Sequence, residues 1–454
     1  MIEQICDFIS IKFMFKKNEK KKYLIAGAGG AGVSNIAQIL MQSGNEVAGF
    51  DKIRNAATSN LERLGVIIFT EDEVKLDDFD VVFRSAALKD DHKIIAEAIK
   101  KGIPVISRYE LFEELSKTRD IVAIAGSSGK TSTTGITSHI LSGDRDCGYL
   151  VGIHGNGGHY GTAPEFILEA DEYAKTFLHL KKIKIGIITG LKYDHVDIYP
   201  TKKEYDDAFM LFASRVEKLI INGDDEYLFN MMKDLNPITF GKGAINEWQA
   251  RNIKNYEGGS SFDVYKLEHK VASITLNVIG GHNIINALAG FVTNYYLNVQ
   301  VKKIVARLSY FRGLPRRVEL LSKAPYYIYD DYAHLPFEIE TVLKGLKESF
   351  PNRKILCVFQ GHTYTRINAF FDDYAKALSN CDELFLMDVY AARDSEGSVD
   401  LEKLISQVHS KVKHLSGGLK ETHEMVKNSI QDANVIIYLN AGDATKIAHE
   451  LAGG

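Results

Sequence analysis

Residues 121–134 read Ile-Val-Ala-Ile-Ala-Gly-Ser-Ser-Gly-Lys-Thr-Ser-Thr-Thr, an apolar strand that runs into a glycine-rich turn and a Lys-Thr pair. Glycines in such a turn let backbone N–H groups point at phosphate oxygens, a lysine reaches the β- and γ-phosphates, and a threonine hydroxyl binds Mg²⁺ where the next helix begins. The full Walker spacing has an earlier glycine where this chain has Ile124, so the motif is partial. The pattern still predicts a nucleotide triphosphate site formed by Gly126, Ser127, Ser128, Gly129, Lys130, Thr131 and Ser132. Lys130 is expected on an exposed turn rather than in a core.

A second glycine-rich turn lies near the start of the chain. The apolar strand 23–28 leads into Gly27-x-Gly29-x-x-Gly32 and a helical pattern, and the next strand ends at Asp51, about 20 residues further on. This is the dinucleotide fingerprint, which favours a nicotinamide enzyme when taken alone. The glycines themselves indicate only a diphosphate at a helix N-terminus, so a UDP-linked sugar or peptide fits equally well.

Composition describes an ordinary globular chain. Its 454 residues suggest three domains, and 45% of them are hydrophobic and 25% charged. The net charge of −4 gives no sign of a broad basic surface for binding nucleic acid. No apolar run is long enough to span a membrane, and residues 1–22 place basic residues after an apolar stretch, the reverse of a secretory signal. The cysteines are scattered, as in a reduced cytosolic protein: Cys6, Cys147, Cys357 and Cys381.

Polar clusters follow two apolar strands of the central region. Residues 169–172 read Glu-Ala-Asp-Glu, and residues 194–197 read Asp-His-Val-Asp. Ligands gather at the carboxyl ends of parallel strands, so Glu169 is suited to hold Mg²⁺ directly or through water. The alternative is an acidic helix cap, but three acids within four residues repel one another unless a cation is near. His195 is either a metal ligand or a structural histidine.

The rest of the chain continues the α/β pattern. Residues 240–278 alternate as strands do, with a turn at Gly258-Gly259, which predicts an antiparallel excursion. Residues 280–283 open a helix that holds Asn286, and the α/β pattern restarts after the segment 313–317, which marks the second boundary. Further strands are expected at residues 81–83 and 105–107 in the first region, and at 326–329, 355–359, 384–387 and 435–439 in the last.

Together these pieces resemble the Mur ligase family, ATP-dependent enzymes that add amino acids to UDP-linked cell-wall precursors. The likeness runs from about residue 22 to residue 443, and its motifs come in family order: 27–32, 126–131, 169–172, 194–197, 282–286, 316–317, 330–336, 362–366 and 388–391. The glycine string 27–32, Asp-Asp-Tyr-Ala-His-Leu-Pro at 330–336 and Asp-Val-Tyr-Ala-Ala at 388–392 look closest to the muramate–alanine ligase branch. Archaeal pseudomurein peptide ligases are the serious competitor.

The resemblance implies three α/β domains. Residues 1–118 would be a Rossmann-like domain that binds the UDP-linked precursor, and residues 119–313 a P-loop ATP-binding domain with the antiparallel excursion. Residues 314–454 would be a Rossmann-like domain that binds the amino acid.

Site residues carry over by the same resemblance. The catalytic set is Lys130, Glu169, His195, Arg317 and Asp330, of which Arg317 and Asp330 also bind ATP. Thr131 and Glu169 would hold one Mg²⁺ or Mn²⁺, and Glu169 with His195 a second. Adenine would contact His282 and Asn286. The UDP group would contact Gly27, Gly29, Gly30, Gly32, Asp51, Arg84 and Ser85. The incoming amino acid would face His334, His362 and Arg366.

The implied reaction starts by activating a carboxylate. ATP transfers its γ-phosphoryl group to give an acyl phosphate, the amine of a free amino acid attacks, and phosphate leaves. The expected partners are therefore a UDP-linked precursor and an amino acid, with no nucleic acid and no membrane insertion. A cytoplasmic monomer or weak dimer is expected.

Five departures from the alanine-ligase pattern bear on the substrate: Phe50 for serine, Arg84 for serine, Ser127-Ser128 for Thr-His, Gly190 for asparagine and Thr363 for arginine. The ATP-side residues Lys130, Thr131, Glu169, His282 and Asn286 are retained. This combination predicts a modified acceptor or amino acid, of the pseudomurein type in the leading variant. A nicotinamide oxidoreductase leaves residues 126–131 without a role, and a P-loop switch protein leaves the acidic and C-terminal clusters without one.

Overall fold

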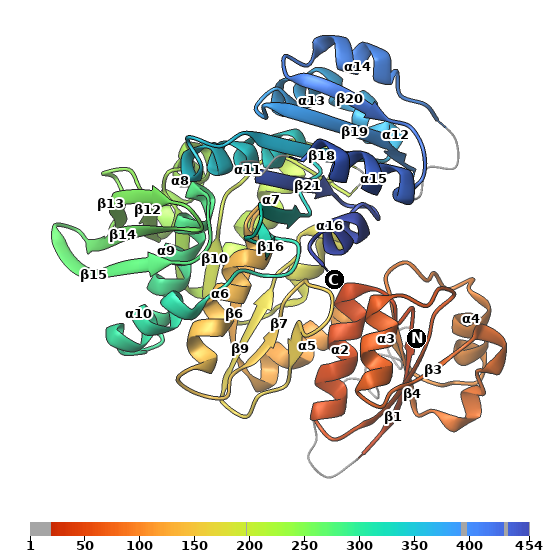
Figure 1. The fold of residues 1–454 in the computed structure, drawn as a ribbon. Helices are drawn as coiled ribbons and strands as arrows, with labels where there is room; N and C mark the ends of the chain where they lie inside the picture. Colours follow the sequence, from red (N-terminus) through yellow and green to blue (C-terminus); the bar gives the residue numbers. More distant parts are fainter. Residues whose placement is uncertain (1–19, 197, 392–396, 431–434, 454) are drawn as a thin grey trace. The chain divides into compact units, whose positions relative to one another are not determined.

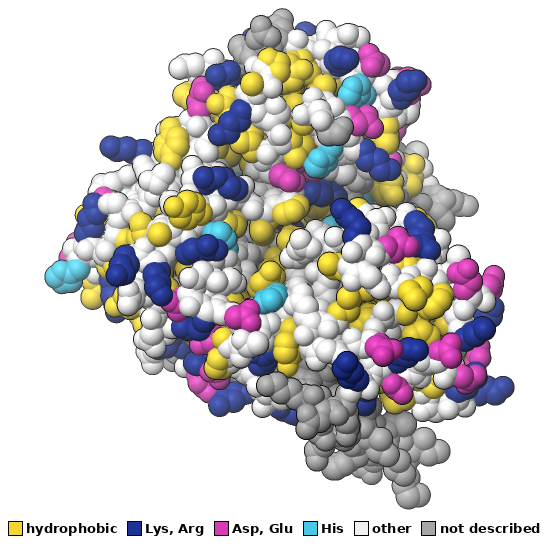
Figure 2. Space-filling model, turned by 60° about the horizontal axis from the view of Figure 1, so that its bottom comes forward, with side chains coloured by type: hydrophobic (Ala, Val, Ile, Leu, Met, Phe, Trp, Pro, Cys, Tyr) yellow, Lys and Arg dark blue, Asp and Glu magenta, His cyan; other side chains and the backbone are white. Residues whose placement is uncertain are grey.

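The computed structural model describes residues 20–453 except 197, 392–396 and 431–434 (Figure 1). Asp197 and most of the predicted N-terminal extension therefore lie outside the described residues. Within the described part, none of the helices combines the length and the apolar character that crossing a membrane requires. On the face drawn in Figure 2, basic and acidic side chains are interspersed.

The first sheet has five parallel strands in the order β3-β2-β1-β4-β5. The strands are β1 Lys22–Ala26, β2 Glu46–Phe50, β3 Ile67–Phe69, β4 Val81–Arg84 and β5 Val105–Ile106. The helices are α2 Ala31–Gln42, α3 Ala56–Arg63, α4 Lys93–Lys100 and α5 Arg108–Thr118. The chain leaves β1 for β2 on one side and places β4 on the other, so the glycine turn after β1 lies at a topological switch point.

Two strand ends in this sheet differ from the prediction by local chemistry. The first strand ends at Ala26 rather than residue 28, because Gly27 turns the chain with a φ of +79°. The strand predicted at 105–107 stops at Ile106, because the Ser107 side chain accepts a hydrogen bond as the N-cap of α5.

The second sheet has ten strands in the order β15-β14-β13-β12-β11-β10-β6-β9-β7-β8. The strands are β6 Asp120–Ala125, β7 Gly148–Leu150, β8 Gly158–His159, β9 Glu165–Glu169, β10 Ile183–Ile188, β11 Val216–Asn222, β12 Ile238–Gly241, β13 Trp248–Tyr256, β14 Gly259–Lys266 and β15 His269–Leu276. The helical segments are α6 Lys130–Ser142, η4 Tyr173–His179, α7 Lys202–Ala213, α8 Glu226–Met232, η5 Lys233–Leu235, α9 Gly281–Tyr296 and α10 Val301–Tyr310.

The antiparallel excursion is confirmed. The neighbouring strands β13, β14 and β15 are joined by two-residue connections, and a connection that short reverses the chain. Gly258 adopts a φ of +84° in the first of these turns. The short β7–β8 antiparallel pair was not predicted. β6 lies between β9 and β10 and pairs with both in parallel, so its carboxyl end is again a switch point.

The third sheet has six strands in the order β16-β17-β21-β18-β19-β20, parallel apart from the β16–β17 pair. The strands are β16 Glu319–Ser322, β17 Tyr327–Asp331, β18 Ile355–His362, β19 Glu383–Tyr390, β20 Lys411–Leu415 and β21 Val435–Asn440. The helices are α11 Pro336–Ser349, α12 Tyr364–Ala369, α13 Phe371–Leu378, α14 Leu401–Gln407, α15 Leu419–Ser429 and α16 Thr445–Leu451.

Contacts divide the chain into two compact units. The first contains the chain through Ala250, Val264–Ala272 and Asn286–Arg307, and the second contains Arg251–Asp263, Ser273–Ile285 and the chain from Leu308. One apolar core in the first unit is continuous from β1 and α2 to β11 and α8. Two cores in the second unit cover the two faces of the third sheet.

Candidate active site

The glycine turn after β6 forms an open helix N-terminus. Gly126 and Gly129 have φ angles of +130° and +77°, and Gly129 is the N-cap of α6 without a side-chain cap. A Cβ atom on Gly129 would lie 2.8 Å from Asn286 Oδ1, so only glycine fits this close approach. Asn286, on α9, also accepts a hydrogen bond from Thr133 Oγ1 at 3.2 Å. The structure thus brings the predicted residue Asn286 to the turn.

Lys130 is enclosed rather than exposed, so the expectation that it lies on an exposed turn is wrong. Its side chain is 14% exposed, and its Nζ atom lies 2.9 Å from a Glu172 carboxylate oxygen and 2.7 Å from the Gly126 carbonyl oxygen. Glu172 itself is 1% exposed. The turn after β9 folds Glu172 beneath the phosphate turn, a long-range contact that a local sequence pattern does not contain.

His195 joins the same group. Its Nε2 atom lies 3.5 Å from Glu172 Oε1 and 3.7 Å from Asp194 Oδ2, and its φ is +56°. The Tyr199 hydroxyl donates to the Glu172 carbonyl oxygen at 2.7 Å and fixes the turn. Glu172 therefore lies between Lys130 and His195.

Thr131 and Glu169 form a second pair beside it. The Thr131 hydroxyl donates to Glu169 Oε1 at 2.9 Å, and the Gly152 N–H donates to Glu169 Oε2 at 2.8 Å. The predicted association of Thr131 with Glu169 is present. His195, which was predicted to share a metal with Glu169, contacts Glu172 instead. Glu172 is the residue that sequence reasoning did not single out, although the run of acids at 169–172 was the signal for it.

Charges in this group reinforce one another. Burial lowers the pKa of Lys130, but the carboxylates of Glu172, Asp171 and Glu169 raise it by more, so the ammonium is favoured. Burial raises the pKa of Glu172, but Lys130 and His195 lower it by more. Burial also lowers the pKa of His195, and Glu172, Asp194 and Asp171 together bring it above its ordinary value. These contacts place the Glu172 carboxylate between the Lys130 ammonium and the His195 imidazole, whose pKa is raised.

A pocket of about 820 Å³ lies in the first unit at the carboxyl edge of the first sheet. Of the residues predicted to contact the UDP group, it is lined by Gly30, Gly32, Arg84 and Ser85. The Gly29 N–H donates to Asp51 Oδ2 at 2.7 Å, so the predicted acid stabilises the glycine turn. Arg84 forms an ion pair with Asp90. The pocket is also lined by Arg108 and Asp171, which the sequence analysis did not assign to this site.

Asp330, at the end of β17 in the second unit, is completely buried. It accepts hydrogen bonds from Thr445 Oγ1 at 2.5 Å and Asn440 Nδ2 at 3.2 Å, and Arg316 Nε lies 3.5 Å away. Arg317 places its guanidinium 5.5 Å from the centre of the Tyr332 ring. Asp330 and Arg317 thus lie on neighbouring segments of one unit.

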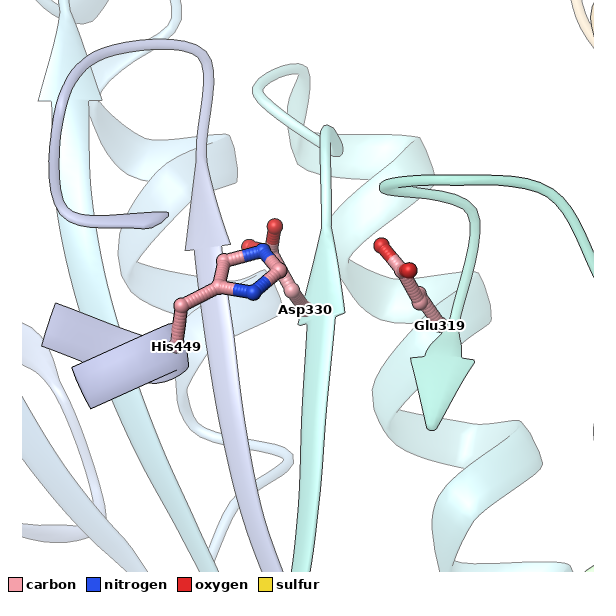
Figure 3. Close-up of side chains that lie close together, drawn as sticks. All are labelled: Glu319, Asp330 and His449. Carbon is pink, nitrogen blue, oxygen red and sulfur yellow. The ribbon is translucent and has the colours of Figure 1, made fainter. Parts of the chain in front are cut away.

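Glu319, Asp330 and His449 converge from β16, β17 and α16 (Figure 3). Their ligand-type atoms lie within 4.8 Å of one another, the one such group of three found among the described residues. Glu319 accepts a hydrogen bond from the Arg316 N–H at 2.8 Å. The Arg316 guanidinium also faces Asp330, with Nε 3.5 Å from Oδ2, so a protein cation lies beside this group.

The residues predicted to face the amino acid also meet in the second unit. Arg366 Nη1 lies 3.1 Å from His362 Nδ1, and the rings of His334 and His362 are 6.0 Å apart. Glu338 accepts from the His334 N–H at 3.2 Å. Thr363 is 4% exposed, with a φ of +67°, and its hydroxyl caps α12. At the position where the family pattern has an arginine, this chain therefore has a buried threonine whose hydroxyl accepts a hydrogen bond from the backbone.

The predicted residues thus assemble as two groups. In the first unit lie Gly126–Thr131, Glu169, His195, Asn286 and the pocket residues, and in the second lie His282, Arg317, Asp330, His334, His362 and Arg366.

Three family models match consecutive segments of the chain. Residues 22–120 match the Mur ligase family catalytic domain, residues 124–293 the Mur ligase middle domain, and residues 316–443 the Mur ligase glutamate ligase domain. The first and third segments contain the first and third sheets, and the second contains all of the second sheet except the start of β6.

Among curated proteins, the UDP-N-acetylmuramate–L-alanine ligase of Clostridium novyi is 35% identical over 96% of this chain and 98% of its own length. The enzyme of the same name from Levilactobacillus brevis is 34% identical over 93% of this chain and 95% of its own.

Among solved structures, the UDP-N-acetylmuramate-alanine ligase MurC of Thermotoga maritima matches with a TM-score of 0.82 and 26% identity, over 95% of this chain and 98% of that one. A pseudomurein peptide ligase type C of Methanothermus fervidus matches with a TM-score of 0.63 and 19% identity, over 96% and 99%, and shares the fold. These matches confirm the predicted resemblance and the three-sheet α/β fold, and the chain belongs to the Mur ligase family.

Proposed function

We propose that this chain is an ATP-dependent ligase that joins an amino acid to the carboxylate of a UDP-linked cell-wall precursor. The observation that carries the proposal is the Lys130–Glu172–His195 group beneath an open phosphate turn, next to a pocket on the fingerprint turn of the first sheet. The three proposed domains are residues 1–118 for the precursor, 119–313 for ATP and 314–454 for the amino acid.

The chemistry follows from these residues. A carboxylate is a poor electrophile, so its oxygen must first become a leaving group. Lys130 and the N–H groups at the start of α6 are placed to neutralise charge on the transferring phosphoryl group. The resulting acyl phosphate is attacked by the amine of the amino acid, and phosphate departs as the amide forms.

The donor set at the turn suits a hard divalent cation. The Thr131 hydroxyl and the Glu169 carboxylate lie 2.9 Å apart, and Glu172 and His195 lie 3.5 Å apart beside them. Thr131 and Glu169 would hold Mg²⁺ or Mn²⁺, and Glu172 with the neutral form of the His195 imidazole would hold a second ion. Such ions supply charge neutralisation for phosphoryl transfer. Glu172 thus replaces Glu169 as the proposed partner of His195.

UDP-N-acetylmuramate and L-alanine are the first substrates to test, because the curated relatives at 34–35% identity carry these two names. A modified acceptor or amino acid is the second candidate. It is favoured by Arg84 in the pocket wall and by the buried Thr363 in an arginine's place. Because ATP and UDP-linked precursors are cytoplasmic compounds, we place the protein there, as a monomer or weak dimer.

The deciding experiment is a coupled assay of phosphate release. The protein, ATP and Mg²⁺ are incubated with each pairing from a panel of amino acids and UDP-linked acceptors, with every single omission as a control. Release that requires UDP-N-acetylmuramate and L-alanine supports the first candidate. Release with a UDP-linked amino acid or peptide instead supports the second.

A binding measurement addresses the oxidoreductase alternative. Calorimetry with NAD and with UDP-N-acetylmuramate is expected to give binding of the UDP compound alone. Micromolar NAD binding without UDP binding would overturn the ligase proposal.

A further inference from the structure

The segment 189–192, which follows β10, lies along the phosphate turn and is hydrogen-bonded to it. The Ser127 N–H donates to the Gly190 carbonyl oxygen at 3.1 Å, and the Ser127 hydroxyl donates to the same oxygen at 3.3 Å. The hydroxyl also accepts a hydrogen bond from the Lys192 N–H at 2.7 Å. At the next residue of the turn, the Ser128 carbonyl oxygen accepts from the Thr189 hydroxyl. Two successive residues of the turn are thereby joined to this segment.

These contacts occupy the hydrogen-bonding groups of Ser127. A serine hydroxyl has one proton to donate, and here that proton is directed at the Gly190 carbonyl oxygen. An ionised phosphate oxygen can only accept, so it would have to break this contact in order to bind the hydroxyl. The Ser127 N–H is directed at Gly190 as well. The hydroxyl that the sequence assigns to the nucleotide thus joins two backbone segments in this structure.

Ser127 and Gly190 are two of the five departures from the alanine-ligase pattern, and the structure places them in contact. Ser127 bonds to the carbonyl oxygen of residue 190, a group that every residue has. The nearest atom to a Cβ on Gly190 would be Asp225 Oδ2 at 3.5 Å, which is an ordinary contact. The link between turn and segment therefore depends on the hydroxyl of residue 127, and a side chain at residue 190 is compatible with it.

The segment continues to His195, which belongs to the candidate active site. Lys192 lies three positions before His195. His195 has a φ of +56°, a conformation that surrounding contacts must impose, and its Nε2 atom lies 3.5 Å from Glu172 Oε1. Glu172 in turn contacts Lys130 at 2.9 Å. Contacts therefore run from Ser127 through the segment to His195, and return through Glu172 to Lys130 on the same turn.

The segment has a second support on its other side. The Leu191 N–H donates to Asp225 Oδ2 at 2.7 Å, and the Asn222 amide donates to the Thr189 carbonyl oxygen at 3.1 Å. These contacts tie the segment to the end of β11 and the start of α8, and they do not involve the phosphate turn. Loss of the Ser127 hydroxyl is therefore expected to leave the fold intact and to loosen only the link between the segment and the turn.

We propose that Ser127 is a positioning residue whose hydroxyl holds the segment 190–195 against the phosphate turn and thereby sets where His195 lies relative to Lys130. The inference rests on the proposed function, because the position of His195 affects turnover only if phosphoryl transfer takes place at this turn. Nucleotide affinity depends instead on Lys130 and on the N–H groups at the start of α6. Removing the hydroxyl should therefore slow turnover and leave the KM for ATP nearly unchanged.

Amide hydrogen exchange of the full chain, without nucleotide or metal, tests the positioning by itself. Ser127→Ala is expected to speed exchange of the Lys192 amide about 5-fold or more, because this N–H loses its acceptor. Ser127→Thr keeps a hydroxyl and should retain slow exchange. Ser214→Ala is the matched control, because Ser214 is exposed and its hydroxyl also donates to a backbone carbonyl oxygen, that of Leu211. Thermal unfolding checks that each variant is folded.

Kinetics of phosphate release, with the substrates that the unsubstituted protein uses, test the consequence. Ser127→Ala is expected to lower kcat about 10-fold and to change the KM for ATP less than about 2-fold, with Ser127→Thr restoring most of kcat. A raised KM for ATP at unchanged kcat would make the hydroxyl a nucleotide ligand and overturn the inference. Unchanged exchange at Lys192 in folded Ser127→Ala would also overturn it and leave the ligase proposal standing. Absence of phosphate release by the unsubstituted protein with every substrate pair would overturn the ligase proposal itself, and with it the catalytic role of Ser127.

Discussion

At the residue scale, the phosphate turn is organised by one buried carboxylate. Glu172 is 1% exposed and touches both Lys130 and His195, so removing any one of the three leaves its neighbours with uncompensated charge. A lysine already held at the turn loses little side-chain entropy when phosphate arrives. This preorganisation is what charge stabilisation in phosphoryl transfer requires.

Lys130→Ala is expected to lower the rate of phosphate release by at least about 100-fold, because a contact to the transferring phosphoryl group is lost. It should also destabilise the protein by roughly 3 kcal/mol, since Glu172 stays buried without its cation. Phosphate release and urea unfolding measure the two effects. Lys203→Ala, at an exposed helix position, should change neither, and near-normal release by folded Lys130→Ala would remove the ATP assignment.

Glu172→Gln and Glu169→Gln should separate the two carboxylates. We expect both to raise the Mg²⁺ concentration needed for half-maximal phosphate release, because each loses a charged oxygen ligand. Glu172→Gln should also destabilise the buried pair with Lys130 and thus lower the maximal rate about 100-fold. Asp197→Asn is the comparison variant, and we expect it to change the Mg²⁺ requirement less than Glu169→Gln does. An unchanged Mg²⁺ requirement in both Glu variants would contradict the metal assignment.

Asp331 should make the folded protein more stable as the pH falls, which is the opposite of the usual effect of a carboxyl group. Burial raises the pKa of Asp331 to about 6, against the opposing effects of Arg317 and of hydrogen bonds from Ala333 and Val318. A raised folded-state pKa of an acid means that the folded protein binds the proton more tightly than the unfolded chain. This group therefore stabilises the fold increasingly as the pH falls from about 6 to about 4, and the stabilisation is lost as the pH rises through about 6.

The test is the difference in unfolding free energy between the unsubstituted protein and Asp331→Asn, measured in urea from pH 4 to pH 7. That difference should change by up to about 3 kcal/mol over the range. Asp372→Asn, at an exposed carboxylate, is the control. A difference that does not vary with pH would show that Asp331 titrates normally.

At the element scale, α2 is joined to the second sheet by a polar contact. Asn35 is completely buried; its amide donates to the carbonyl oxygens of Val151 at 2.9 Å and Ile153 at 2.7 Å, and its Oδ1 accepts from the Gly157 N–H at 3.1 Å. The same helix carries the glycine turn that lines the pocket. The pocket and the phosphate turn are thereby held on one framework.

Asn35→Ala is expected to destabilise the protein by about 2–3 kcal/mol, because two carbonyl groups and one N–H lose a buried partner. Chemical denaturation measures this loss. Ser59→Ala, at an exposed position on α3, is the control and should stay within about 0.5 kcal/mol of the unsubstituted protein. If Asn35→Ala also changed the unfolding free energy by less than about 0.5 kcal/mol, water would have to replace the hydrogen bonds of the Asn35 amide.

At the scale of the whole molecule, the cores differ in how far they extend. The core of the first unit runs without a break from residues of the first sheet to residues of the second. The two cores on the third sheet draw all their described members from Val318 onward, except Ile279. The third sheet is therefore the more independent folding unit.

A fragment of residues 314–454 is expected to unfold cooperatively by itself, whereas residues 20–118 should not, because that fragment loses the apolar partners of α2 and α5. Circular dichroism during thermal unfolding of the two fragments, with the full chain as reference, provides the check. A cooperative transition in 20–118 alone would contradict the shared core.

Local chemistry determined the fold class and most of the candidate site. Alternation of apolar strands with helices predicts three α/β sheets, and the glycines at 27–32 and 126–129 predict two phosphate-type turns. Gly27, Gly126 and Gly129 have positive φ angles, which only glycine adopts freely. The resemblance built on ordered motifs then led to the Mur ligase family, which the curated relatives confirm.

Tertiary structure alone decided which side chains meet. Nothing in the run Glu-Ala-Asp-Glu states which acid reaches Lys130; the turn at 174–175, where both φ angles are positive, selects Glu172 and leaves Glu169 to Thr131. Sequence periodicity likewise cannot place Arg108 near Asp171, 63 positions further along. A side chain's neighbours depend on how sheets and helices pack, which is a long-range property, whereas turns and strands follow from residues close in sequence.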